Sequence, residues 1–200
     1  MDFVSLLIPL LVVVLVVAAL FAVTGLVIIN ERQVGVVVKR FAGKSLPPDR
    51  LIALHGEAGY QADTLAPGFH LGYFPWVYNI RKVPVTVIPQ GEIGLVVAAD
   101  GSSIPPERIL GKVVDSDDFQ DARKFLSNGG EKGRQLGILT AGAYRINTAL
   151  FTVITRANAE MNDMDAHDLL VYSIHPDMVG IVTTLDGAPI PEGEIAGLYL

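Results

Sequence analysis

The sequence predicts a strand-rich α+β protein with a single N-terminal apolar helix and internal repeats, and three observations lead to this fold class. Residues 3–30 contain no charged residue and no histidine. The chain that follows is rich in valine, glycine and proline, which is typical of short strands joined by tight turns. Two blocks of sequence then recur in the same order, which indicates a repeated structural unit.

The uncharged N-terminal stretch predicts a transmembrane anchor over residues 1–30, with Phe3, Leu15 and Ile29 among its residues. A helix needs about 20 apolar residues to cross the hydrocarbon core, and this stretch is longer. A cleaved signal peptide would begin with basic residues, whereas this chain begins with the acidic Asp2. A helix lying in the interface would need a charged face, which is missing.

The charges beside this stretch predict its orientation. Basic residues follow it at Arg32, Lys39, Arg40 and Lys44. Because such residues favour the cytoplasmic side of a membrane, we expect a single-pass membrane protein whose soluble part is cytoplasmic.

Composition excludes several classes of function. A net charge of −6 argues against a nucleic-acid partner, because phosphate contacts need a clustered basic surface. The chain has no cysteine, which rules out disulfides, cysteine-ligated zinc and a thiol nucleophile.

The repeat divides the chain after the anchor into a first unit at 31–89, a second at 90–176 and a truncated third at 177–200. Residues 93–111 align with 179–197 without a gap, and 34–53 match them with one extra residue before Gly43. A second block, 56–68, recurs at 130–142. We assign the recurring positions to structural turns: Gly35, Pro67, Gly68, Gly94, Gly101, Gly142, Gly180 and Gly187.

Local patterns predict the elements within these units. Residues 33–41 and the alternating stretch 77–89 are typical of strands. The second unit carries an insertion in which 119–126 could form one or two helical turns, beginning at Asp117 or Asp118. Because the third unit stops before its second block, we expect the N-terminal part of a longer protein.

Residues 29–85 resemble the stomatin–prohibitin–flotillin family, also called band 7 or SPFH. The matching features are the Asn30-to-Gly35 segment after the apolar stretch, the turn Pro67-Gly68-Phe69-His70, the aromatic-proline group at 74–76 and the strand 80–85. The duplicated units look more like the longer bacterial flotillin-like members. This resemblance implies an SPFH-like α+β domain on the membrane surface and homo-oligomers formed through a segment beyond Leu200.

A group of aromatic and basic side chains could contact a lipid surface. Aromatic side chains favour the headgroup zone, and basic ones attract anionic lipid. The alternative is that the aromatic residues form the core of the domain. The candidate residues are Phe69, Tyr73, Phe74, Trp76, Arg81 and Lys82.

No catalytic constellation is evident, so the sequence predicts a protein that is not an enzyme and has no cofactor or metal. The stretch 163–168 has metal-ligand residue types but no second cluster, and is better explained as a solvated acidic loop. His70 corresponds to Tyr144 in the second unit, which favours a ring packed under a turn.

The function that follows from these patterns is a membrane-anchored scaffold that oligomerises and organises membrane microdomains or partner membrane proteins. A regulatory subunit of a membrane protease and an extracytoplasmic binding module are the alternatives.

Overall fold

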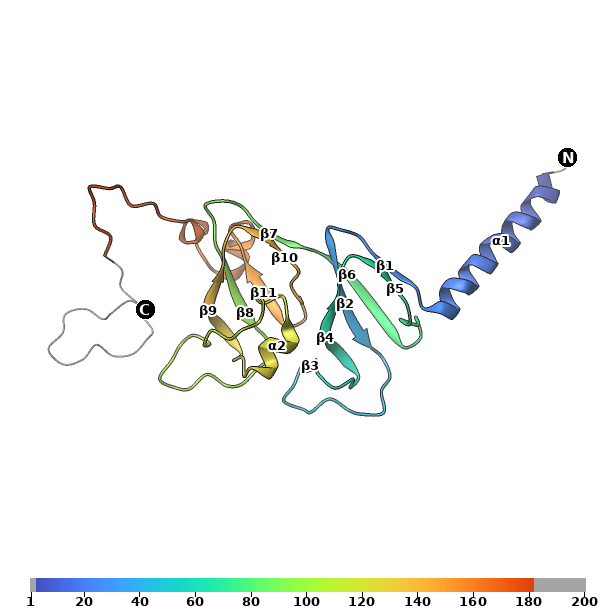
Figure 1. Ribbon diagram of the computed structural model, residues 1–200, viewed down its shortest axis with the longest axis horizontal. Coiled ribbons are helices and arrows are strands. Elements are labelled where there is room, and N and C mark those ends of the chain that lie inside the picture. Colours follow the sequence, from blue (N-terminus) through green and yellow to red (C-terminus); the bar gives the residue numbers. More distant parts are fainter. Residues whose placement is uncertain (1–2, 182–200) are drawn as a thin grey trace.

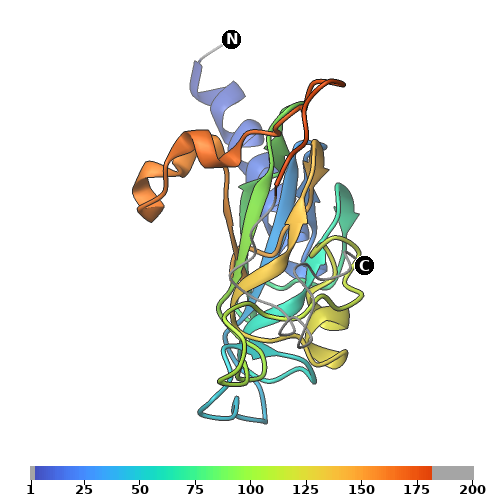
Figure 2. The same cartoon turned by 90° about the vertical axis from the view of Figure 1, so that its left-hand side faces the viewer.

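The computed structural model describes residues 3–181, in which short strands dominate and helices are few. Helix α1 (Phe3–Thr24) projects from one end, and two groups of strands follow side by side (Figure 1). Figure 2 views the same arrangement from the end remote from α1 in Figure 1. The third unit from residue 182 onward, including Gly187, lies outside the described residues.

The predicted anchor over residues 1–30 is not one element. Helix α1 ends at Thr24, and Gly25 follows with a positive φ of 61°. A Cβ on Gly25 would lie 2.7 Å from the backbone nitrogen of Phe74, so only glycine fits this close approach. The chain then enters strand β1 (Val27–Ile29), where Ile29 is buried in the domain instead of continuing a helix.

The described part of the chain contains no helix with the length and apolar character that crossing a membrane requires. The prediction of a single-pass transmembrane anchor, made on residues that include Phe3, Leu15 and Ile29, is therefore wrong. The fold class is corrected to a strand-rich domain with two α-helices among the described residues. The single-pass membrane localisation, with the rest of the chain in the cytoplasm, is corrected with it.

Unit 1 (residues 27–84) contains a four-stranded sheet and a two-stranded sheet. In the larger sheet, strands β3, β4, β2 and β6 are neighbours in that order. Strand β1 pairs with β5 in the smaller one. Their bounds are β2 (Gln33–Lys39), β3 (Ile52–Ala53), β4 (Gly59–Leu65), β5 (Gly68–His70) and β6 (Tyr78–Pro84).

Unit 2 (residues 86–154) repeats this arrangement with three strands in its larger sheet, because the counterpart of β3 is a single bridge between Gly111 and Gln135, and it adds helix α2 (Ala122–Ser127). Strands β11, β8 and β9 form one sheet, and β7 pairs with β10 in another. Asp121 caps α2 by accepting a hydrogen bond from the Lys124 N–H, so the helix begins later than the sequence predicted. The bounds of the strands are β7 (Thr86–Ile88), β8 (Gly94–Ala98), β9 (Gly133–Leu139), β10 (Gly142–Tyr144) and β11 (Phe151–Ile154).

Three short 3-10 helices follow unit 2. They are η1 (Arg156–Asn158), η2 (Glu160–Asn162) and η3 (Ala166–Leu169). They cover part of the β8 sheet, because Leu169 is buried beside Ile154 and Leu95 packs against the same cluster.

The two units have the same strand register. In unit 1, the pairing of β2 with β4 is irregular between Val36 and Val38. In unit 2, the pairing of β8 with β9 is irregular at the equivalent place, between Leu95 and Val97. The sequence repeat therefore corresponds to a repeat of backbone pairing. The equivalent pairs are Gly35 with Leu65 and Lys39 with Gly59 in unit 1, and Gly94 with Leu139 and Ala98 with Gly133 in unit 2.

The boundary between the units differs from the one predicted after residue 89. The stretch 77–89 forms two strands, and the second of them, β7, pairs with β10 of unit 2. Because β1 pairs with β5 in the equivalent way, each unit begins with a short strand that pairs with a later strand of the same unit.

Candidate functional site at the junction of the two units

Asp100 forms a buried polar contact between the units. It stands in the turn after β8, and only 2% of its surface is exposed. Its Oδ2 accepts hydrogen bonds from the backbone N–H groups of Leu51 and Ile52 in unit 1, at 2.8 and 2.9 Å. The guanidinium of Arg50 lies 3.8 Å from Oδ1. A carboxylate of unit 2 thus accepts the backbone N–H groups at the start of strand β3 in unit 1.

Gly101 makes this position of Asp100 possible. Its φ is +141°, and a Cβ there would lie 2.6 Å from the backbone oxygen of Gly130. The Gly101 N–H also donates to Asp100 Oδ1 at 2.7 Å. The backbone of the turn therefore helps to orient the carboxylate toward unit 1. The Asp-Gly pair therefore has two roles: it reverses the chain, and it places a hydrogen-bond acceptor, the Asp100 carboxylate, against unit 1.

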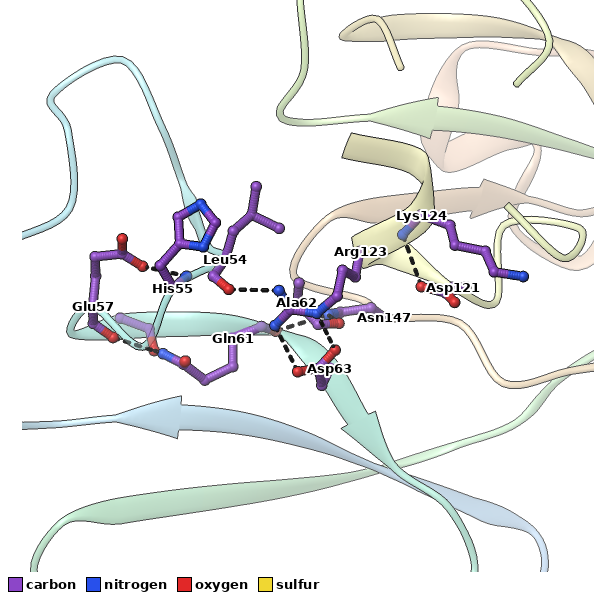
Figure 3. A network of polar contacts seen from close by, with 11 residues as sticks. Leu54, His55, Glu57, Gln61, Ala62, Asp63, Asp121, Arg123, Lys124 and Asn147 are labelled. Carbon is purple, nitrogen blue, oxygen red and sulfur yellow. Dashed lines mark hydrogen bonds and ion pairs between the residues drawn. The ribbon is translucent and has the colours of Figure 1, made fainter. Parts of the chain in front are cut away.

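Arg123 of helix α2 makes a second contact with unit 1, shown in Figure 3. Its Nε and Nη2 donate to the two carboxylate oxygens of Asp63 at 2.8 and 2.7 Å, and Nη1 donates to the backbone oxygen of Leu54. The hydrogen bond that Arg123 donates to Asp63 raises the pKa of Arg123. Because the Asp63 side chain is two-thirds exposed, solvent screens this ion pair, and it contributes mainly orientation.

Asn147 makes a third contact, from the loop between β10 and β11. Its side-chain amide is fully buried and donates to the backbone oxygens of Gln61 and Ala62 in β4, both at 3.0 Å (Figure 3). Its own oxygen accepts the Ala149 N–H at 3.1 Å. This buried amide therefore joins the two units.

An apolar core lies behind these polar contacts and includes residues of both units. Ile52 and Ala62 of unit 1 belong to the same buried cluster as the aromatic residues of unit 2. The rings of Phe125 and Phe151 meet edge to face at a centroid distance of 4.9 Å. The junction is therefore a packed interior and not a flexible linker. The cluster comprises Ile52, Ala62, Ile88, Val96, Ala98, Phe119, Ala122, Phe125, Leu126, Leu139, Tyr144, Ile146, Leu150 and Phe151.

Each unit also holds a glutamate that accepts a hydrogen bond from a nearby backbone N–H. Glu57 accepts the His55 N–H at 2.8 Å in unit 1, and Glu131 accepts the Lys112 N–H at the same distance in unit 2. Glu131 also binds Arg108. The Arg108 hydrogen bond, followed by that from Lys112, holds the pKa of Glu131 below its ordinary value.

We expect Glu131 to make stability depend on pH. Its pKa is lower in the folded protein than the ordinary value of 4.5, so its contribution is present above that value and is lost as pH falls through the folded pKa. The variant Glu131→Gln should therefore show a weaker decline in the free energy of unfolding below about pH 5, measured by urea titration at several pH values. Glu107→Gln, at an exposed glutamate, is the control, and parallel curves for Glu131→Gln and the wild type would contradict this role.

The candidate lipid-contact residues divide into two groups. Tyr73 packs against the buried cluster of unit 1 and meets Tyr78 edge to face at 5.3 Å, which is a core role. Phe69 and Trp76 are exposed, and Trp76 stacks on Phe74 at 5.3 Å. Arg81 and Lys82 are also exposed, and Arg81 lies over the ring of Tyr60.

The positions assigned to structural turns also divide. Gly35 lies inside β2, whereas three other glycines are the first residues of strands: Gly68 of β5, Gly94 of β8 and Gly142 of β10. Pro67 stands at the turn before β5, and Gly101 stands at the junction. Gly180 lies near the end of the described chain.

His70 and Tyr144 have the same role in the two units. His70 Nε2 lies 2.7 Å from the Ala66 oxygen, and Tyr144 Oη donates to the Thr140 oxygen at 2.9 Å. Each ring thus spans the turn that precedes its strand, as the sequence comparison of the two positions suggested.

Among residues 3–181, no group of three or more His, Cys, Asp or Glu side chains is arranged to hold a metal ion. Sequence reasoning did not single out the junction residues Asp100, Asp63, Arg123 and Asn147. One signal could have found the first of them, because the aspartate before the turn glycine recurs as Asp186.

The fold and the junction define a class of protein in which consecutive β units are packed against one another. Comparison of the chain with protein-family models, curated proteins and solved structures finds no match. The resemblance to the stomatin–prohibitin–flotillin family therefore stays a prediction.

Proposed function

We propose that this protein is a non-enzymatic scaffold, in which consecutive β units are held in a fixed relative geometry and present their outer surfaces to partner proteins. The observation that carries this proposal is the junction, where a buried carboxylate and a shared apolar core join unit 1 to unit 2. A flexible linker would be enough to tether two independent domains. A packed junction instead fixes their orientation, which is the property a scaffold needs.

The chain has no native cysteine, so paired labels can test this fixed geometry directly. Spin labels placed on cysteines at Asp49 and Lys132, which are exposed in unit 1 and unit 2, should give a single narrow distance distribution. A pair within unit 1, at Asp49 and Asn79, is the matched control. A distribution much broader than that of the control would contradict a rigid scaffold.

Self-association and the identity of the partner proteins stay predictions. If the assembly segment lies beyond Leu200, the 200-residue chain should have a monomer mass of 21.4 kDa in light scattering after size exclusion. A mild detergent is appropriate, because the described apolar side chains of α1 are exposed. An assembly of many copies would place the self-association surface within these 200 residues instead.

A further inference from the structure

Unit 2 exposes a face that is covered on unit 1. On β4, Ala62 is only 2% exposed, because unit 2 packs over it. Its equivalent on β9 is Leu136, three residues before the paired Leu139 as Ala62 is before Leu65, and it is 57% exposed. Ile138 on the same face is 48% exposed. Strand β9 lies on the side of unit 2 that is remote from unit 1 (Figure 1). Large apolar side chains on such a face indicate a contact surface.

The loop beside this face repeats the loop that receives Asp100. In unit 1, the Arg50 N–H donates to the Pro47 oxygen at 3.1 Å, and in unit 2 the Arg108 N–H donates to the Pro105 oxygen at 3.0 Å. The chain after each arginine then runs parallel to the neighbouring strand, with Ala53 opposite Gln61 and Gly111 opposite Gln135. By this correspondence, the Ile109 and Leu110 N–H groups occupy the positions of the Leu51 and Ile52 N–H groups that bind Asp100.

The sequence of the third unit supplies the matching acceptor. Residues 179–197 align with 93–111 without a gap, which places Asp186-Gly187 on Asp100-Gly101. The first unit has Phe41 and Ala42 before its Gly43, and it follows helix α1 instead of another unit. An aspartate before the turn glycine is therefore present in the second and third units, each of which follows another unit, and is absent from the first.

We propose that the β9 face of unit 2 is the docking surface for the third unit of this chain, and that the Asp186 carboxylate binds the N–H groups of Ile109 and Leu110 there. This inference rests on the proposed scaffold, and it extends a single junction to a row of units that repeat the same contact. Two features suit the third unit to this surface. Its carboxylate matches a pair of backbone N–H donors, and its apolar side chains would cover Leu136 and Ile138.

Hydrogen exchange of the full 200-residue chain tests this proposal at individual amides. In Asp186→Asn, the Ile109 and Leu110 amides should exchange faster by roughly tenfold to a hundredfold, because a charge-assisted acceptor is lost. The Leu51 and Ile52 amides should be unchanged, which shows that units 1 and 2 remain folded. In Asp100→Asn, the Leu51 and Ile52 amides should exchange faster, and the Ile109 and Leu110 amides should be unchanged. Asp177→Asn, at an exposed aspartate, controls for the loss of one negative charge.

Unchanged exchange at Ile109 and Leu110 in Asp186→Asn would overturn the proposal, and so would an equal acceleration in Asp177→Asn. Neither result bears on the spin-label distance between units 1 and 2, so a failure here is distinguishable from a failure of the scaffold itself.

Discussion

Replacing Phe125 with alanine should lower the free energy of unfolding by about 3–5 kcal/mol, the largest effect expected from a single substitution in this chain. Phe125 is fully buried, and its ring contacts those of Phe119 and Phe151. Truncation removes the apolar surface and leaves a cavity that rigid strands on both sides cannot fill. Urea titration followed by circular dichroism measures the change.

The matched control for Phe125→Ala is Phe69→Ala, because Phe69 is 75% exposed. We expect that variant to remain within about 0.5 kcal/mol of the wild type. Because the cluster around Phe125 includes Ile52 and Ala62, Phe125→Ala should weaken unit 1 together with unit 2. Loss of only the signals of unit 2 would contradict a shared core.

Replacing Asp100 with asparagine should lower the free energy of unfolding by about 2–3 kcal/mol. The carboxylate accepts three backbone N–H groups through its two oxygens, whereas an amide has one oxygen and an NH2 group that donates. At least one buried N–H group at the junction therefore loses its acceptor. Urea titration gives the change in free energy, and the spin-label distance between the units should broaden.

Asp49→Asn is the control for Asp100→Asn, since Asp49 is an exposed aspartate in the loop that precedes β3. It should change the free energy of unfolding by less than about 0.5 kcal/mol. An equally small effect of Asp100→Asn would show that the apolar core alone holds the units together, without a contribution from the carboxylate.

The repeat was readable from the sequence because it depends on local chemistry. Turn glycines and valine-rich strands recur in order, and the structure gives the two units the same register. The equivalence of His70 and Tyr144 was also readable, because each ring contacts a turn only four residues away. Such contacts are fixed by short-range spacing, which a single sequence contains.

The N-terminal stretch shows where composition misled. Residues 3–30 are uniformly uncharged, but they form a helix to Thr24 and then a strand, because Gly25 turns the chain and Ile29 is buried in unit 1. Hydropathy alone does not distinguish apolar residues of a helix from those of a buried strand. The corrected boundary depends on the pairing of β1 with β5, some forty residues later in the chain.

The sequence by itself determined the strand-rich character, the order of the repeated blocks and the turns within each unit. Only the tertiary structure decided the junction. Asp100 and Asn147 have ordinary local contexts, and their importance comes from backbone groups that lie 48 and 85 positions away in the sequence. Burial and long-range hydrogen bonding depend on how the units pack, and no local pattern of residue types contains that information.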